Sequence, residues 1–71
     1  MSALVKKVES QIETAEADVK ELEMLKNNAS RPTVQARLDA AINLAKKDIV
    51  ALKKTLDAEK EREALGAGRA G

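Results

Sequence analysis

The sequence predicts an all-α fold: an antiparallel helical hairpin of two long helices, dimerising into a four-helix bundle. Three observations predict it. Apolar residues recur every three or four positions along two segments, which places them on one face of a helix. Residues unfavourable to helices separate the segments around Pro32. Each segment also carries apolar residues beside its main stripe, which widens the apolar face beyond what one partner helix covers.

The first helix is expected over residues 2–27. Ser2 is a favourable N-cap residue, and the apolar stripe that follows keeps heptad spacing until Lys26 takes the next position. The stripe consists of Val5, Val8, Ile12, Ala15, Val19 and Leu22.

The bend lies between the two asparagines at 27–28 and Pro32. Ser30 is the expected N-cap of the second helix, because serine accepts hydrogen bonds from free N–H groups and proline suits the first helical turn. Proline also disfavours α geometry at Arg31, whose side chain can cap the first helix or contact a partner.

The second helix is expected over residues 32–65. Its stripe ends at Leu56, since the next heptad positions are Glu59 and Glu63, and we expect the last two turns to be solvated. Gly66 is the expected C′ residue, with 66–71 as a flexible tail or linker start after a domain of residues 1–65. The stripe consists of Leu38, Ile42, Ala45, Ile49, Leu52 and Leu56.

The expected core is the two stripes as far as Leu52, packed in antiparallel register. Facing residue numbers then sum to a constant, and a sum of 57 sets each small alanine opposite a large isoleucine. The facing pairs are Val19–Leu38, Ala15–Ile42, Ile12–Ala45, Val8–Ile49 and Val5–Leu52.

Further apolar residues widen both stripes on one flank, which is typical of a bundle rather than a two-stranded coil. Exposed apolar patches mark interaction surfaces, so this flank is the candidate dimer face. The alternative is a monomer whose alanine-rich flank tolerates water. The candidate dimer face consists of Leu4, Ala17, Met24, Leu25, Ala41, Leu44 and Ala51.

The composition argues against a catalytic, cofactor or metal site. The chain has no Cys and no His, which excludes disulfides, the usual zinc sites and imidazole catalysis, and its carboxylates lie on helix surfaces without a pocket. We therefore expect no enzyme, cofactor or metal. A net charge of +1 and the absence of aromatic residues argue against nucleic-acid binding. No apolar run is long enough to span a membrane and no signal pattern is present, so we expect a cytoplasmic or nuclear protein.

A row of lysines follows one flank of the second helix. Lys46, Lys53 and Lys60 recur every seven residues and suggest a site for an acidic partner. Acidic residues interleave with them, which favours the alternative of an ordinary solvated helix face.

The bend carries the run Leu25-x-x-x-Ala29-Ser30-Arg31-x-x-Val34-x-x-x-Leu38, preceded by Asp18-Val19-Lys20-Glu21-Leu22. Over about residues 18–50 this pattern resembles the N-terminal domain of the Siah-interacting protein (calcyclin-binding protein) family. It implies a hairpin that dimerises, with Ala29, Arg31, Val34 and Leu38 shaping the bend around Pro32.

The resemblance also implies a scaffold that links a ubiquitin ligase to adaptor proteins through downstream domains that this chain does not include. GAGRAG stands where the family has a proline-rich ligase-binding segment, so dimerisation is the property that carries over. We expect the chain to bind itself, and ligase components only through those downstream domains. The alternative is a small chaperone-type arm, like prefoldin or a tubulin cofactor, that holds clients on its apolar flank.

Overall fold

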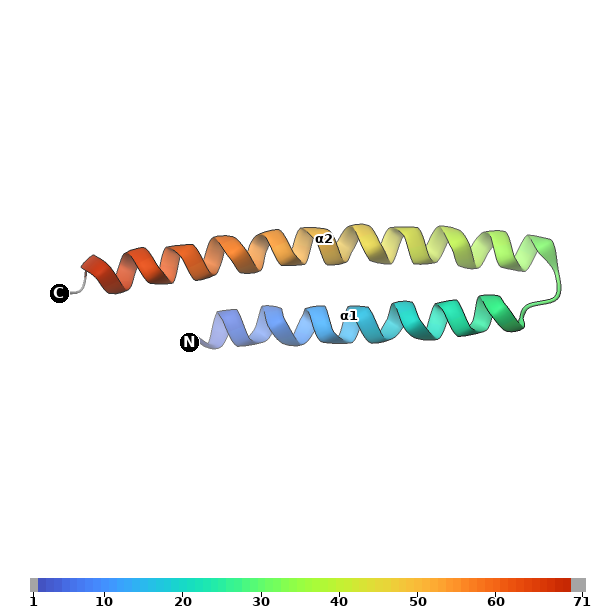
Figure 1. The fold of residues 1–71 in the computed structure, drawn as a ribbon, viewed down its shortest axis with the longest axis horizontal. Coiled ribbons are helices and arrows are strands. Elements are labelled where there is room, and N and C mark those ends of the chain that lie inside the picture. Colours follow the sequence, from blue (N-terminus) through green and yellow to red (C-terminus); the bar gives the residue numbers. More distant parts are fainter. Residues whose placement is uncertain (1, 70–71) are drawn as a thin grey trace.

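The computed structural model describes residues 2–69, and side chains as far as Gly66. Two helices, α1 (Ala3–Asn28) and α2 (Pro32–Arg69), run antiparallel side by side (Figure 1). The molecule measures 60 × 14 × 11 Å. The predicted all-α hairpin is confirmed, while its pairing with a second copy remains a prediction.

The start of α1 follows the sequence closely. Ser2 has extended backbone geometry, and its Oγ accepts a hydrogen bond from the Val5 N–H at 3.2 Å. This is the N-cap interaction, which satisfies one of the free N–H groups of the first turn. The predicted cap at Ser2 is confirmed.

The bend consists of residues 29–31, and it uses backbone carbonyls rather than a serine cap. The Arg31 carbonyl accepts from the N–H groups of Val34 (3.1 Å) and Gln35 (3.0 Å), so Arg31 is the residue that precedes the helix. The expectation that Ser30 caps α2 is therefore wrong. Gln35 Nε2 donates to the Ala29 carbonyl at 2.7 Å and ties the bend to the first turn of α2.

The C-terminal boundary of α2 also differs from the expectation. The helix continues through Gly66 to Arg69, and no glycine among the described residues has a positive φ. Glycine costs about 1 kcal/mol in a helix but does not forbid it, and only a left-handed C′ residue would end the helix there. Residues 70–71 of the expected tail lie outside the described residues.

The core is a single line of side chains between the helices. Val19, Ile42 and Ile49 form one buried cluster, and the partly buried Ala15 and Ala45 pack against it. Six other residues were predicted to lie in the core. The buried ones are Val5, Val8 and Ile12, and the partly buried ones are Leu22, Leu38 and Leu52.

The predicted register is wrong by about one heptad. In a register of 57, Ser2 would face residue 55 and Lys26 would face residue 31. Instead Ser2 hydrogen-bonds Glu63 and Lys26 pairs with Asp39, each eight residues further along α2. Eight residues correspond to about 12 Å of helix. A shift of seven residues keeps the same apolar positions on the seam, so the apolar pattern alone fits both registers.

The corrected register changes what lies at the end of the hairpin. Glu59 and Glu63, expected to be solvated beyond the seam, lie against the start of α1 and are only partly exposed. The overhang of α2 therefore begins after Glu63 rather than after Leu56.

Candidate interaction surface

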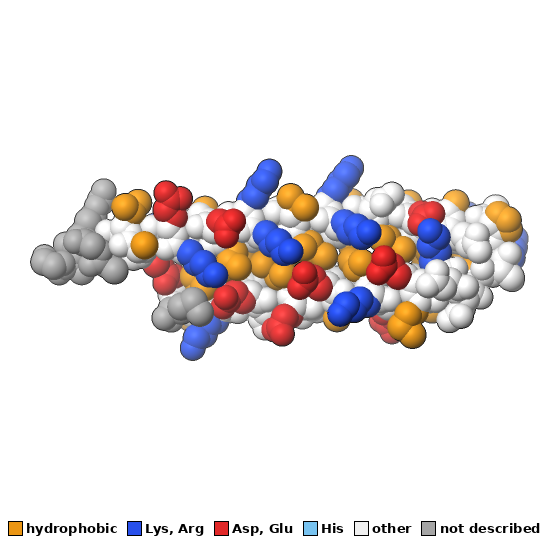
Figure 2. Space-filling model, in the orientation of Figure 1, with side chains coloured by type: hydrophobic (Ala, Val, Ile, Leu, Met, Phe, Trp, Pro, Cys, Tyr) orange, Lys and Arg blue, Asp and Glu red, His pale blue; other side chains and the backbone are white. Residues whose placement is uncertain are grey.

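The seam has two flanks, and one of them is held by ion pairs. Glutamates of α1 alternate with lysines of α2 along the line between the helices (Figure 2). We call this side the ion-paired flank. Its pairs are Glu9–Lys60 (3.8 Å), Glu16–Lys53 (3.7 Å) and Lys26–Asp39 (2.6 Å).

The ion-paired flank accounts for most of the lysine row. Lys53 and Lys60 already have glutamate partners within the molecule, so they are poor candidates for binding a separate acidic protein. Exposed pairs of this kind contribute about 0.2–1 kcal/mol each. They place glutamates of α1 beside lysines of α2, so the charges on this flank attract across the seam.

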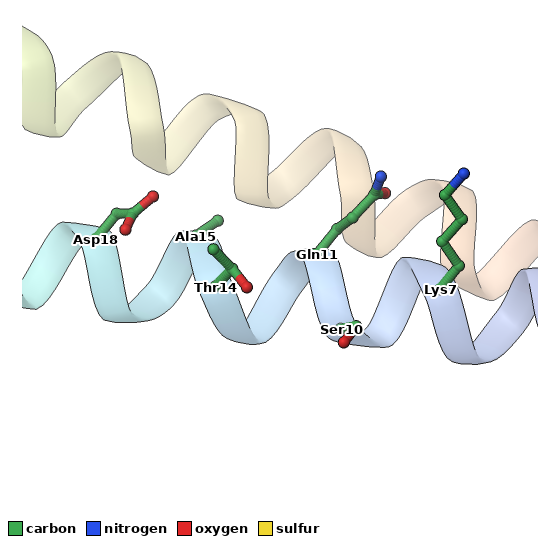
Figure 3. A pocket seen from close by; sticks show the side chains of 6 residues that line it. All are labelled: Lys7, Ser10, Gln11, Thr14, Ala15 and Asp18. Atoms are coloured by element: carbon green, nitrogen blue, oxygen red, sulfur yellow. The ribbon is translucent and has the colours of Figure 1, made fainter.

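The opposite side, which we call the open flank, has no ion pair between the helices within the described residues. It is hollowed by two shallow grooves of about 430 and 460 Å³ that share Gln11. In Figure 3, Lys7, Gln11 and Asp18 point from α1 toward α2. The groove-lining residues are Lys7, Ser10, Gln11, Thr14, Ala15 and Asp18 of α1, and Asp48, Ala51, Leu52 and Thr55 of α2.

Most of the candidate dimer face belongs to the open flank. Ala51 lines a groove, and Leu44 lies seven residues before it, which is the same side of the helix. On α1, Leu4 and Leu25 hold the same relation to Gln11 and Asp18. These three leucines are 63%, 48% and 53% exposed respectively.

Three predicted members lie less centrally. Ala17 and Met24 are exposed and directly precede Asp18 and Leu25, which places them toward the outer side of α1. Ala41 is partly buried. Sequence reasoning also missed Leu65, which is exposed and continues the seven-residue spacing of Leu44 and Ala51. That spacing was the available signal, but the expectation that the last two turns of the second helix are solvated left Leu65 out.

The bend residues contribute to the bend through backbone hydrogen bonds more than through their side chains. Ala29 is partly buried and offers its carbonyl to Gln35, whereas Arg31, Pro32 and Val34 are exposed. Among the described residues, the Arg31 side chain has no hydrogen bond that caps α1. Val34 adds another exposed apolar side chain near the bend.

A polar clamp joins the two ends of the hairpin. The Ser2 hydroxyl donates to one oxygen of Glu63, and the Ser2 backbone N–H donates to the other at 3.2 Å. The hydroxyl bond is the main reason that the pKa of the Glu63 carboxyl lies below its ordinary value of 4.5, and partial burial opposes it.

The clamp predicts a pH dependence of stability. Because the pKa of Glu63 is lower in the folded state, its stabilising effect is fully present above about pH 4.5 and is lost as the pH falls through the folded value. Glu63→Gln should therefore lower the unfolding midpoint at pH 7 and reduce the loss on acidification. Thermal unfolding between pH 7 and 3 tests this.

Glu61→Gln is the matched control, because Glu61 is exposed and forms no hydrogen bond or ion pair with another described residue. An equal change in the pH profile of both variants would show that Ser2 does not hold the Glu63 carboxylate.

No group of three or more carboxylates within residues 2–69 is arranged to hold a metal ion. Over the same stretch, neither helix is long and apolar enough to cross a membrane. Comparison with family models, curated proteins and solved structures finds no match to this chain.

Proposed function

We propose that this chain is a non-enzymatic dimerisation module whose two copies form a four-helix bundle. The observation that carries the proposal is the imbalance between its core and its surface. Among the residues whose side chains the structure describes, six are buried, all of them valine or isoleucine, whereas seven large hydrophobic residues are at least 38% exposed. A chain of this size gains only about 3–5 kcal/mol from one core, so covering part of that surface would add substantially.

The role of such a module is to couple whatever is attached to it. Joining two copies raises the effective concentration of each attached binding site near its target, without any new contact to that target. The resemblance of the bend to the Siah-interacting protein family supports a scaffold of this kind in ubiquitin-ligase assembly.

Solution mass tests the proposal directly. Sedimentation equilibrium of the parent protein at micromolar concentration should give twice the chain mass of 7.6 kDa. A monomer at that concentration would contradict the proposal and would favour the client-holding arm instead.

Charging the candidate dimer face should separate the copies. Leu44→Glu places a carboxylate in the expected interface, where truncation or charging of a central residue costs about 2–4 kcal/mol, a weakening of roughly 30- to 1,000-fold. We expect a monomer at micromolar concentration with a lower unfolding midpoint, since dimerisation stabilises the folded state by mass action.

Val50→Glu is the matched control, because Val50 is similarly exposed on α2 but lies outside the candidate dimer face. It should remain dimeric. A dimer that survives Leu44→Glu would place the interface elsewhere.

A further inference from the structure

We propose that the second copy docks head to tail on the open flank, with Lys7 of each hairpin beside Asp18 of the other copy. The inference rests on the proposed function and adds to it the face, the direction and the register of the dimer.

Charge distribution selects the open flank over the other side of the seam. On the ion-paired flank, Glu9 and Glu16 are already neutralised by Lys60 and Lys53, and covering them would remove these groups from water without new partners. The grooves of the open flank carry three charged residues, Lys7, Asp18 and Asp48, and between them the lining is uncharged, with Gln11, Thr14, Ala51 and Thr55. Uncharged and apolar surface costs less to desolvate.

The shape of the molecule requires docking along its length. One end of the hairpin measures 14 × 11 Å, whereas one side measures 60 × 14 Å, or about 800 Å². Stable interfaces bury about 800 Å² on each partner. A lengthwise contact is therefore the one that supplies a normal interface.

Two directions are open to a face-to-face pair with two-fold symmetry. If the axis runs along the hairpin, α1 of one copy lies over α2 of the other. On α1, Asp18 lies nearer the bend than Gln11 does. On α2, Asp48 lies nearer the bend than Ala51, which lines a groove with Gln11, so this arrangement sets aspartate near aspartate. Like charges in apposition are unfavourable.

If the axis instead crosses the hairpin, the copies run head to tail and α1 lies over α1. An axis passing between Gln11 and Thr14 brings Lys7 of one copy to Asp18 of the other, and symmetry repeats the pair. The charges at the two ends of the first groove, Lys7 and Asp18, are opposite in sign, which is what this arrangement needs.

The same axis gives a compatible contact on α2. Gln11 lies beside Ala51 and Leu52, so the axis passes near Ala51, and the two copies of Ala51 meet. Leu44 of each copy then reaches the level of Ala58 of the other. Alanine at both places leaves room for close approach of the helices and for the leucine side chain.

Single cysteines test the register, since the chain has no cysteine of its own. We expect Ala51→Cys to form a disulfide-linked dimer under mild oxidation, because the two copies lie near the axis. Val50→Cys is the matched control: it is also exposed, one position along the same helix, and should stay unlinked.

Charge reversal tests the direction. Lys7→Glu and Asp18→Lys should each weaken the dimer at least about tenfold, because each replaces two attractive contacts with two repulsive ones. The combined variant should recover most of the affinity. Lys6→Glu, an exposed neighbour outside the open flank, should leave it unchanged.

The outcomes separate this inference from the proposed function. A dimeric parent protein whose Ala51→Cys variant stays unlinked, or whose double charge reversal fails to recover affinity, overturns the head-to-tail dimer and leaves the dimerisation module standing. A monomeric parent protein overturns both.

Discussion

Replacing Ile42 by alanine should remove most of the hairpin's free energy of unfolding at 25 °C. Ile42 is 5% exposed and belongs to the one buried cluster, with Val19 and Ile49. Truncating a buried isoleucine to alanine costs about 2–5 kcal/mol, and a chain of this size has about 3–5 kcal/mol available from its core. The neighbouring side chains include small alanines, which cannot fill the space. Helical circular dichroism during urea titration, at fixed protein concentration, measures the loss.

Val50→Ala is the control for the Ile42 substitution. Val50 lies on the same helix and is 54% exposed, so its truncation should change the free energy of unfolding by no more than about 0.5 kcal/mol. Similar effects of the two substitutions would mean that the seam contributes little and that the helices are held together in some other way.

The architecture was predictable because its signals are local. Heptad spacing on both sides of Pro32 specifies two amphipathic helices, and Ser2 specifies where the first one starts. These preferences act over one or two turns of helix, and the structure contains both helices and the cap.

The register was not predictable from the apolar stripes because a heptad pattern repeats. Sliding α2 by seven residues returns valine, isoleucine, leucine or alanine to nearly every seam position. The charges along the flank repeat in part as well, because Lys46, Lys53 and Lys60 recur every seven residues. The contacts at the two ends of the hairpin, Lys26 with Asp39 and Ser2 with Glu63, have no counterpart seven residues earlier, where α2 carries Pro32 and Leu56, so these polar residues contained the information that the core lacked.

The candidate dimer face was only partly predictable for a related reason. The seven-residue spacing of Leu44 and Ala51 predicts an apolar flank on the second helix. Whether that flank lies on the same side of the seam as Gln11 depends on how the two helices pack. The second groove answers this, because Gln11 of α1 and Ala51 of α2 both line it. Leu65 lies beyond the end of the stripe at Leu56, so the apolar pattern did not include it.

Replacing Glu59 by leucine should make the protein more stable. Val5 is fully buried and lies between Ser2, which contacts Glu63, and Glu9, which contacts Lys60. Glu59 occupies the next seam position after Leu56 and its side chain is 18% exposed, so a leucine there would extend the apolar seam by one layer over Val5. Burying most of a leucine side chain contributes about 1.5–3 kcal/mol.

We expect the thermal midpoint of Glu59→Leu to rise by roughly 6–24 °C, the range that such a gain gives in a domain of this length. The Arg62–Glu59 pair that it removes contributes little, because the Arg62 side chain is 76% exposed and its nitrogen lies 3.6 Å from the carboxylate. Glu61→Leu, two positions further on, points to solvent and should leave the midpoint nearly unchanged. In a register where Leu52 faces Val5, Glu59 would lie beyond the end of α1 and neither leucine would stabilise the hairpin. An unchanged midpoint for Glu59→Leu would therefore contradict the register on which the clamp, the ion-paired flank and the head-to-tail dimer all depend.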